Sequence, residues 1–493
     1  MAQAEGYKNI FKSTFLFGFV QVFNIAVKVV LNKIAAILLG PSGMGIIGLF
    51  NNSTSMLQTG CGLGIPQSAV RDISEANSQD NYDRFSLTIS VTNKIVLFTA
   101  FLGVAVTIIL SPLLSQWAFG SNQYILSYIL LSLCVGFSIM TEGKLAVLKG
   151  MRRLRHLAKA SMLGSILGLL IAVPFYYFLG TQGIAPAIVT LSLGTYIVAE
   201  IYVRKIRYNR IKTSFRRFWT LVKNMVKMGC SLMLVSFISL LFSLAVSAYI
   251  SYSGSLSDVG LYQAGVTIIS SYFGIVITAM STEYYPRISA VCRDNGKLQD
   301  EMNRQSEVGL IMIFPLVVLF IFLSSFFIQI LYDSSFEKSN DYTNYALLGT
   351  IIIIVSNSMG MILLAKQASQ IFLLSVITQR LILLGVYFLL YSMYGLLGLG
   401  FAYIFTGVLH ISLMSAILKK FYGISLNKRV ISLLALILSV AILMILIRTI
   451  NSVPIRYSAG TIGIIFSLAY SLYYMRAKLD IDLITIIKNK IHR

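Results

Sequence analysis

Long apolar segments, each followed by a short polar connection, run through the whole chain. A segment of about 20 apolar residues is long enough to cross a bilayer as an α-helix. Fourteen segments meet this condition, and we therefore predict fourteen transmembrane helices. They cover approximately residues 10–39, 44–70, 86–110, 123–148, 158–179, 183–203, 226–251, 258–285, 306–331, 342–365, 370–392, 395–418, 430–448 and 456–475.

The composition agrees with an all-α polytopic membrane protein. The 493 residues are 57% hydrophobic and only 12% charged, which excludes an ordinary soluble domain. The four cysteines stand singly, without the spacing of a disulfide framework or a metal site. The first apolar segment is too long for a signal peptide and no small-residue cleavage site follows it, so we expect it to remain as the first span.

Lysine and arginine gather in alternate connections. The positive-inside rule places the basic connections and both termini in the cytoplasm. The net charge of +22 thus marks a cytoplasmic surface that meets anionic lipid, and we expect no nucleic-acid partner. The basic set comprises Lys8 and Lys12, Arg71 and Arg84, 149–159, 204–227, 287–304, Lys366 and Arg380, 419–429, and the tail from Arg476. Connections without Lys or Arg are 40–44, 111–123, 180–183 and 394–397.

Four polar residues interrupt the first apolar segment. Gln21, Asn24, Lys28 and Asn32 are spaced so that they share one face of a helix. A lysine at this depth costs at least about 2.5 to 3.5 kcal/mol in a bilayer, so such residues normally face a bundle interior or a watery cavity. We predict that this face lines a hydrophilic cavity with Lys28 as its cation. The alternative is that Lys28 snorkels to an interface, as we expect for Lys33.

The second half of the chain resembles the first at an offset of about 215 residues. The polar stripe of the first helix then aligns with serines that include Ser239 and Ser243, and Lys28 aligns with Ser243. The repeat predicts two six-helix lobes around a central cavity, related by an axis along the membrane normal, with two extra C-terminal helices. Cationic groups would gather in the first lobe, and hydroxyls in the second. The predicted parts are the first lobe at 1–203, a basic cytoplasmic linker at 204–225, the second lobe at 226–418, the two extra helices at 419–475 and a basic cytoplasmic tail at 476–493.

Glu142 lies inside the fourth apolar segment, about eight residues before Gly150. An intramembrane carboxylate is a candidate site for a coupling ion, which here would be a proton or a sodium ion. The nearby Lys144 offers another interpretation, a structural ion pair. We expect no other cofactor, no metal and no catalytic residue.

Several motifs occur in a fixed order relative to the spans. They are NKIAAILLGPSGMGIIGLF at 32–50, GLGIPQSAVRDISEA at 62–76, LAVLKGMRRLRHLAKASMLGSILG at 145–168, DVGLYQAG at 258–265 and YYPRIS at 284–289. In this arrangement, which covers essentially the whole chain, the sequence resembles the Wzx-type polysaccharide flippases of the multidrug/oligosaccharidyl-lipid/polysaccharide exporter superfamily.

The resemblance implies a transporter of the bacterial cytoplasmic membrane and no enzyme. Its substrate would be a polyprenyl-diphosphate-linked oligosaccharide, moved to the outer face by alternating access for O-antigen or capsule biosynthesis. Cationic cavity residues of the family would correspond to Lys28 and, at the cytoplasmic end of the second span, Arg71. The implied partners are the lipid-linked oligosaccharide, membrane lipids, a polysaccharide polymerase and a chain-length regulator.

Other functions stay open at this point. A lipid II flippase or a multidrug/cation antiporter of the same superfamily would share the spans, but an antiporter for cationic drugs would favour buried carboxylates over Lys28. A membrane glycosyltransferase or polymerase would need a charged catalytic loop on the outer side. The outer loop 332–342 carries several charges, and we interpret it as an ordinary solvated turn.

Overall fold

The computed structural model describes residues 2–78, 82–151, 153–206 and 215–478. The described residues form helices and short turns without a strand. Eleven helical stretches among them are long and apolar enough to cross a membrane. Arg155–Arg204 and Gln370–Tyr422 each contain two of the predicted spans, and Val20–Cys61 covers the larger part of two more. The prediction of an all-α polytopic membrane protein is confirmed. The predicted tail lies outside the described residues from 479 onward, as does 207–214 of the predicted linker.

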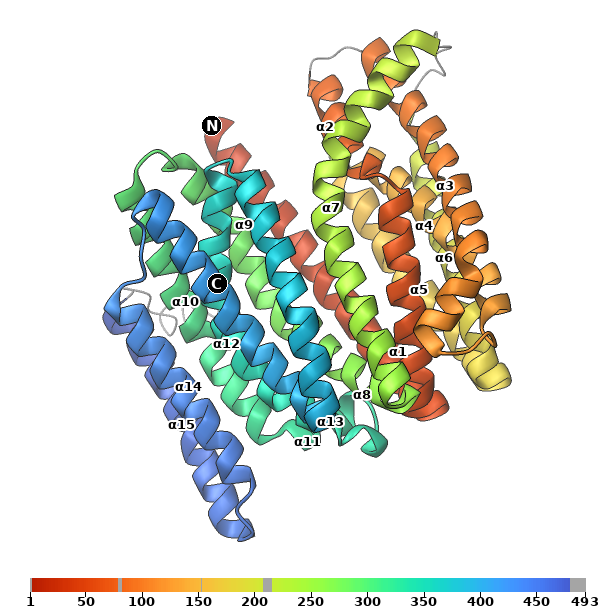
Figure 1. Ribbon diagram of the computed structural model, residues 1–493. Helices are drawn as coiled ribbons and strands as arrows, with labels where there is room; N and C mark the ends of the chain where they lie inside the picture. The colour runs from red at the N-terminus through yellow and green to blue at the C-terminus, as the bar shows by residue number, and fades with distance from the viewer. Residues whose placement is uncertain (1, 79–81, 152, 207–214, 479–493) are drawn as a thin grey trace. The chain divides into compact units, whose positions relative to one another are not determined.

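Two of the connections without charge are tight turns at a glycine. The helices α1 (Ala2–Cys61) and α13 (Ser369–Tyr422) each consist of two helices that meet at Gly40 and Gly395, where φ is 64° and 58°. In Figure 1 the two halves of each run in opposite directions. A left-handed conformation costs other residues roughly 1–2 kcal/mol, which explains the glycines. Gly395 also marks the point at which the predicted segment 370–418 divides into two spans.

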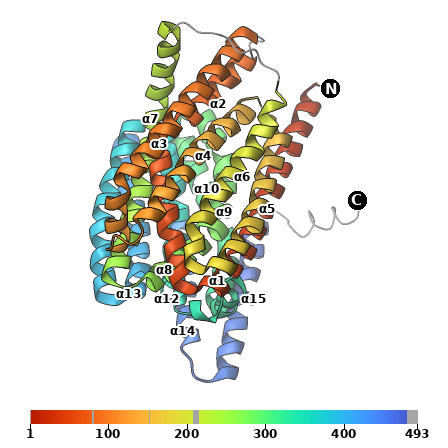
Figure 2. The same cartoon turned by 90° about the vertical axis from the view of Figure 1, so that its right-hand side faces the viewer.

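By its internal contacts the chain divides into two units, Met1–Leu261 with Leu331–Asp333 and Tyr262–Ile330 with Ser334–Arg493. In unit 1, α4 packs against α2, α3 and α6, while α1 packs against α5 and α7. Figure 2 shows α4, α5 and α6 side by side. α7, which the repeat assigns to the second lobe, belongs to unit 1, and the two-lobe division stays a prediction. Beyond α1, the helices of unit 1 are α2 (Ile65–Ser78), α3 (Tyr82–Phe119), α4 (Ile125–Gly150), α5 (Leu154–Leu179), α6 (Ile184–Arg204) and α7 (Phe215–Ser253), with a short 3-10 turn at Gly180–Gly183.

The second predicted span is broken. α1 ends at Cys61, and α2 begins after a turn in which Leu63 and Gly64 have positive φ angles of 51° and 63°. The local sequence Gly-Leu-Gly-Ile-Pro explains the break, since Pro66 cannot donate a backbone hydrogen bond to the preceding turn. Gly64 is also in backbone contact with α7, because an added Cβ would collide with the carbonyl of Gly229. The prediction of one continuous span over 44–70 is therefore wrong.

Unit 2 is built around α10 and the paired α12 and α13. α14 and α15 both pack on α10. The Tyr474 hydroxyl of α15 donates to Glu307 Oε2 at 3.2 Å, and the Ser471 hydroxyl donates to the carbonyl of Ile311 at 3.1 Å. The two extra helices are thus bound to the core of unit 2. α8 (Leu256–Thr267) contains the boundary between the units, and a π-helical segment at Ile268–Phe273 joins it to α9. A short 3-10 turn at Ser334–Phe336 precedes α12. The helices of unit 2 besides α13 are α9 (Gly274–Ala290), α10 (Asn295–Phe322), α11 (Ser324–Leu331), α12 (Ser339–Ala365), α14 (Lys428–Arg448) and α15 (Val453–Lys478).

Arg380 lies inside Gln370–Tyr422, a helical stretch that is long and apolar enough to cross a membrane. It lies eleven residues after Ser369, the first residue of α13, which is about 16 Å along a helix. Tyr387 and Tyr403 of the same helix are within its electrostatic range. The assignment of Arg380 to a connection is therefore corrected, while the expectation that cationic groups gather in the first lobe and hydroxyls in the second stays a prediction.

Candidate functional site

Unit 1 contains a cavity of about 510 Å³ between α1, α4, α5 and α6, which we name the Lys28 cavity. A cavity of this volume has room for many water molecules. α5 contributes small residues, which leave the space open. The lining residues are Asn24, Val27, Lys28, Leu31, Thr141, Leu145, Ala160, Ser161, Gly164, Ser165, Gly168, Leu191, Thr195 and Ala199.

Lys28 supplies the charge of this cavity. Of the described residues that line it, Lys28 alone is charged, and its side chain is exposed to the open space. The other polar groups of the lining are hydroxyls and one amide. Since the surroundings are largely apolar, a cation there attracts an anion more strongly than it would in bulk water. Lys28 thus lines a cavity of unit 1, and its role in substrate binding stays a prediction.

Asn24 joins α1 to α5 through both ends of its amide. Nδ2 donates to Ser161 Oγ at 2.8 Å, and Ser165 Oγ donates to Asn24 Oδ1 at 2.8 Å. The two serines are four residues apart and therefore lie on one face of α5. Asn24 fixes α1 against α5 one turn before Lys28, so it positions the cation in addition to lining the cavity.

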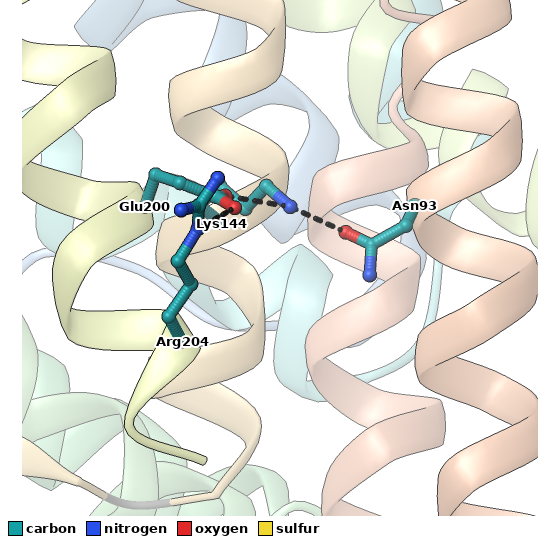
Figure 3. A network of polar contacts seen from close by, with 4 residues as sticks. All are labelled: Asn93, Lys144, Glu200 and Arg204. Carbon is teal, nitrogen blue, oxygen red and sulfur yellow. Dashed lines mark hydrogen bonds and ion pairs between the residues drawn. The ribbon is translucent and has the colours of Figure 1, made fainter. Parts of the chain in front are cut away.

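A charged network joins α3, α4 and α6 (Figure 3). Lys144 Nζ lies 2.9 Å from Glu200 Oε2 and donates to Asn93 Oδ1 at 3.0 Å. Arg204 Nε donates to the other Glu200 oxygen at 2.9 Å. Leu145, which follows Lys144 on α4, and Ala199, which precedes Glu200 on α6, both line the Lys28 cavity. The network therefore holds together two walls of that cavity.

Sequence reasoning missed Asn93 and Glu200. Both are polar residues inside predicted spans, which is a signal for a function or a buried partner. In the structure Lys144 pairs with Glu200, so the ion pair of Glu142 with Lys144 is corrected, and the coupling role of Glu142 stays a prediction. Glu142 Oε2 lies 3.7 Å from Lys149 Nζ, and the two side chains are 41% and 42% exposed.

Glu142 lines a second cavity of unit 1, of about 250 Å³, which we name the Glu142 cavity. It lies between the break that separates α1 from α2, the helix α4 and the helix α7. The adjacent Thr141 lines the Lys28 cavity, so α4 forms a wall of both. The lining residues are Gln58, Thr59, Gly62, Gly64, Pro66, Gln67, Ile139, Glu142, Met233 and Ser236.

Of the other predicted site residues, Gln21, Asn32 and Arg71 line neither cavity. Gln21 is exposed and Asn32 is half-buried on α1, while Arg71 is exposed on α2. Burial raises the pKa of the neighbouring Asp72 carboxyl, and the charge of Arg71 opposes this rise. Arg71 is thus an electrostatic neighbour of a carboxylate, and its role in substrate binding stays a prediction.

Some serines of α7 take part in hydrogen bonds within the helix, and one lines a cavity. The Ser239 hydroxyl donates to the carbonyl of Val235 at 3.0 Å, and the Ser243 carbonyl accepts from the Ser247 hydroxyl at 2.9 Å. Neither Ser239 nor Ser243 lines the two cavities of unit 1, whereas Ser236 lines the Glu142 cavity. Substrate contacts of Ser239 and Ser243 stay predictions. Among the described residues, no group of three or more His, Cys, Asp or Glu could hold a metal ion.

Residues 34–341 match a protein family described as polysaccharide biosynthesis protein. Among curated relatives, the chain is 22% identical over 396 residues to the lipid III flippase of Escherichia coli (strain K12), a match that covers 79% of this chain and 93% of the relative. The lipid III flippase of Shigella flexneri matches with the same identity and coverage.

Solved structures with the same fold include a lipid II flippase in an inward closed conformation, with a TM-score of 0.70 and 12% identity over 96% of this chain and 100% of that chain. An inward-facing MATE family multidrug transporter of the MOP superfamily has a TM-score of 0.66 and 14% identity over 82% of this chain and 96% of that chain. At these identities the likeness concerns the fold. The chain belongs to the polysaccharide biosynthesis protein family and has the helical fold of MOP-superfamily membrane transporters.

Proposed function

We propose that this protein is a flippase that moves a polyprenyl-diphosphate-linked oligosaccharide across the bacterial cytoplasmic membrane by alternating access. The observation that carries the proposal is Lys28, which supplies the charge among the described lining residues of a cavity built from membrane-spanning helices. The names of the relatives, lipid III flippase and lipid II flippase, support a lipid-linked substrate. The protein acts without covalent chemistry, and the basic connections support cytoplasmic termini.

The physical task is to carry a charged, hydroxylated head group through hydrocarbon. Desolvating a phosphate or a hydroxyl without a partner is costly, whereas the lipid tail can stay in the bilayer. Lys28 pairs with the diphosphate, and the serine and threonine hydroxyls of the cavity offer further hydrogen bonds to the diphosphate oxygens. An ion pair at 4 Å is worth about 4 kcal/mol at an effective dielectric of about 20, and about 1 kcal/mol in water. Opening the cavity to water therefore weakens the pair and favours release.

Energy coupling through Glu142 to a proton or sodium gradient remains a prediction. Glu142 lies in a polar cavity, which is suitable for a titrating or ion-binding carboxylate. Lys149, 3.7 Å away, competes with a bound cation for the same oxygen. After transport, the oligosaccharide would pass to a polysaccharide polymerase with its chain-length regulator for O-antigen or capsule assembly.

The test is a complementation experiment in cells that lack their own polysaccharide flippase. Outer-face accessibility of the lipid-linked oligosaccharide is measured for Lys28→Ala, Lys28→Arg and, as a control on the same helix, Lys33→Ala. We expect translocation to fail in Lys28→Ala and to persist in the other two, at equal abundance in the membrane. Translocation by Lys28→Ala at the level of the unmodified protein would refute the cationic-cavity mechanism.

A lipid II flippase is the second candidate. The solved lipid II flippase shares its fold over 96% of this chain, and Lys28 would pair with any diphosphate head group. Supplying each lipid separately in the same assay distinguishes the two. A cation antiporter is disfavoured because the charge in the Lys28 cavity is positive.

A further inference from the structure

The Glu142 cavity offers a mixture of hydrogen-bonding groups. Gln58 and Gln67 each carry an amide with two donor hydrogens and an acceptor oxygen, and Thr59 carries a hydroxyl that can do both. Glu142 contributes a carboxylate, which only accepts. Ile139 and Met233 add apolar surface on α4 and α7. Donors, acceptors and apolar surface converge on one space, as in pockets that select a small organic group.

The break in the helix creates this convergence. Gln58 and Thr59 are in the last turn of α1, and Gln67 is in the first turn of α2, so the turn at 62–64 brings two helix ends to the cavity. Helix ends leave backbone groups without intrahelical partners, which adds polar atoms to the lining. Irregular backbone at membrane depth is tolerated where it lines a watery cavity. The contact of Gly64 with Gly229 holds the turn against α7.

The charges of the cavity argue against a charged group of the substrate as its ligand. A phosphate would face the Glu142 carboxylate, which repels it. A bare cation would compete with Lys149 Nζ, which lies 3.7 Å from the carboxylate. A neutral polyhydroxylated ring meets neither obstacle, since its hydroxyls donate to the carboxylate and exchange hydrogen bonds with the amides, while its C–H face packs on Ile139 and Met233.

We propose that the Glu142 cavity is a subsite for one neutral sugar unit of the transported glycan, separate from the diphosphate site at Lys28. This inference rests on the proposed function. A volume of about 250 Å³ suits a single ring better than a chain of sugars. The adjacent residues Thr141 and Glu142 of α4 line the Lys28 cavity and the Glu142 cavity respectively, so the diphosphate site and the sugar subsite share this helix.

The experiment compares binding of two kinds of lipid to the purified full-length protein. One is undecaprenyl diphosphate, and the other is the same lipid bearing one hexose or one N-acetylhexosamine. Gln67→Leu and Glu142→Leu remove hydrogen-bonding groups from the subsite, whereas Glu142→Gln keeps an acceptor. Gln116→Leu is the control, because Gln116 is an exposed glutamine of unit 1 that lines neither cavity.

The unmodified protein should prefer at least one of the sugar-bearing lipids over the bare diphosphate. Gln67→Leu and Glu142→Leu should reduce that preference roughly two- to tenfold, as for the loss of a hydrogen bond, and leave binding of the bare lipid unchanged. Glu142→Gln and Gln116→Leu should keep the preference. An absent preference, or one that survives both leucine variants, overturns the subsite. Failure to bind any of the lipids overturns the proposed function as well, so the two failures are distinguishable.

Discussion

Replacing Glu200 and Lys144, singly and together, tests whether the charged network of Figure 3 holds α4 against α6. In Glu200→Leu, Lys144 loses a carboxylate at 2.9 Å while its side chain is only 14% exposed. Removing one partner of a buried ion pair costs about 3–5 kcal/mol. Since Lys144 keeps its bond to Asn93, we expect the free energy of unfolding to fall by about 2–3 kcal/mol.

Lys144→Met should cost less than Glu200→Leu. Glu200 then keeps Arg204, whose Nε lies 2.9 Å from Oε1, so the carboxylate stays neutralised. We expect a loss of about 1 kcal/mol from this variant. The double variant replaces both charges by apolar side chains and should also lose only about 1 kcal/mol, because no uncompensated charge remains. The cycle then gives a coupling free energy of about 2 kcal/mol.

The measurement is reversible unfolding of the purified protein in detergent, with one double-mutant cycle for the pair. Arg204→Met is the matched control, since the Arg204 side chain is 77% exposed and its loss should change stability little. Additive single losses would show that the pair contributes no coupling. A larger loss in Lys144→Met than in Glu200→Leu would refute the role given to Asn93 and Arg204.

Three further variants test the other parts of unit 1. Asn24→Leu removes the two hydrogen bonds between α1 and α5 and should lower the free energy of unfolding by about 1 kcal/mol. Asn32→Leu is the control, and equal losses in the two variants would contradict the role of Asn24 in joining these helices. Glu142→Gln should reduce the dependence of the transport rate on an ion gradient. Glu75→Gln is the control and should leave this dependence unchanged, because Glu75 is 42% exposed and paired with Arg84. An unchanged dependence in Glu142→Gln would exclude coupling through Glu142. Gly64→Ala should prevent folding, because its Cβ meets backbone, while Gly395→Ala has open space around its Cβ and should lower stability by about 1–2 kcal/mol. A normal yield of folded Gly64→Ala protein would contradict the close contact of the turn at 62–64 with α7.

The transmembrane helices could be predicted because their signal is local. A segment of sufficient length and apolarity has few alternatives to a helix, since every backbone group must be satisfied within it. The break at 62–64 also has a local signal, two glycines and Pro66 within five residues, but continuous hydrophobicity concealed it. Lys144 and Glu200 could not be paired from sequence, because they are 56 positions apart and meet only when α4 packs on α6.

Arg380 shows the limit of reading topology from charge. The positive-inside rule counts Lys and Arg near the ends of spans and cannot tell whether one lies inside a helix. Here the apolar residues before Arg380 are too few to span by themselves, so the charge resembles the end of a loop in sequence. In the structure the helix begins at Ser369 and continues through Arg380. Nearby tyrosines of α13 supply polar surroundings that sequence distance alone does not reveal.

The stripe on the first helix shows why a polar face and a binding face are different predictions. Periodicity states that Asn24 and Lys28 share a face, and the structure agrees, since both line one cavity. Yet the Asn24 amide is engaged with Ser161 and Ser165, while Lys28, one turn away, is an exposed residue of the cavity lining. A helix face can meet a neighbouring helix at one turn and a cavity at the next, and only packing decides which. The hydrogen bonds of the Asn24 side chain hold α1 against α5 and so determine the position of Lys28. Substitutions at Asn24 should therefore change the affinity for substrate through the position of Lys28.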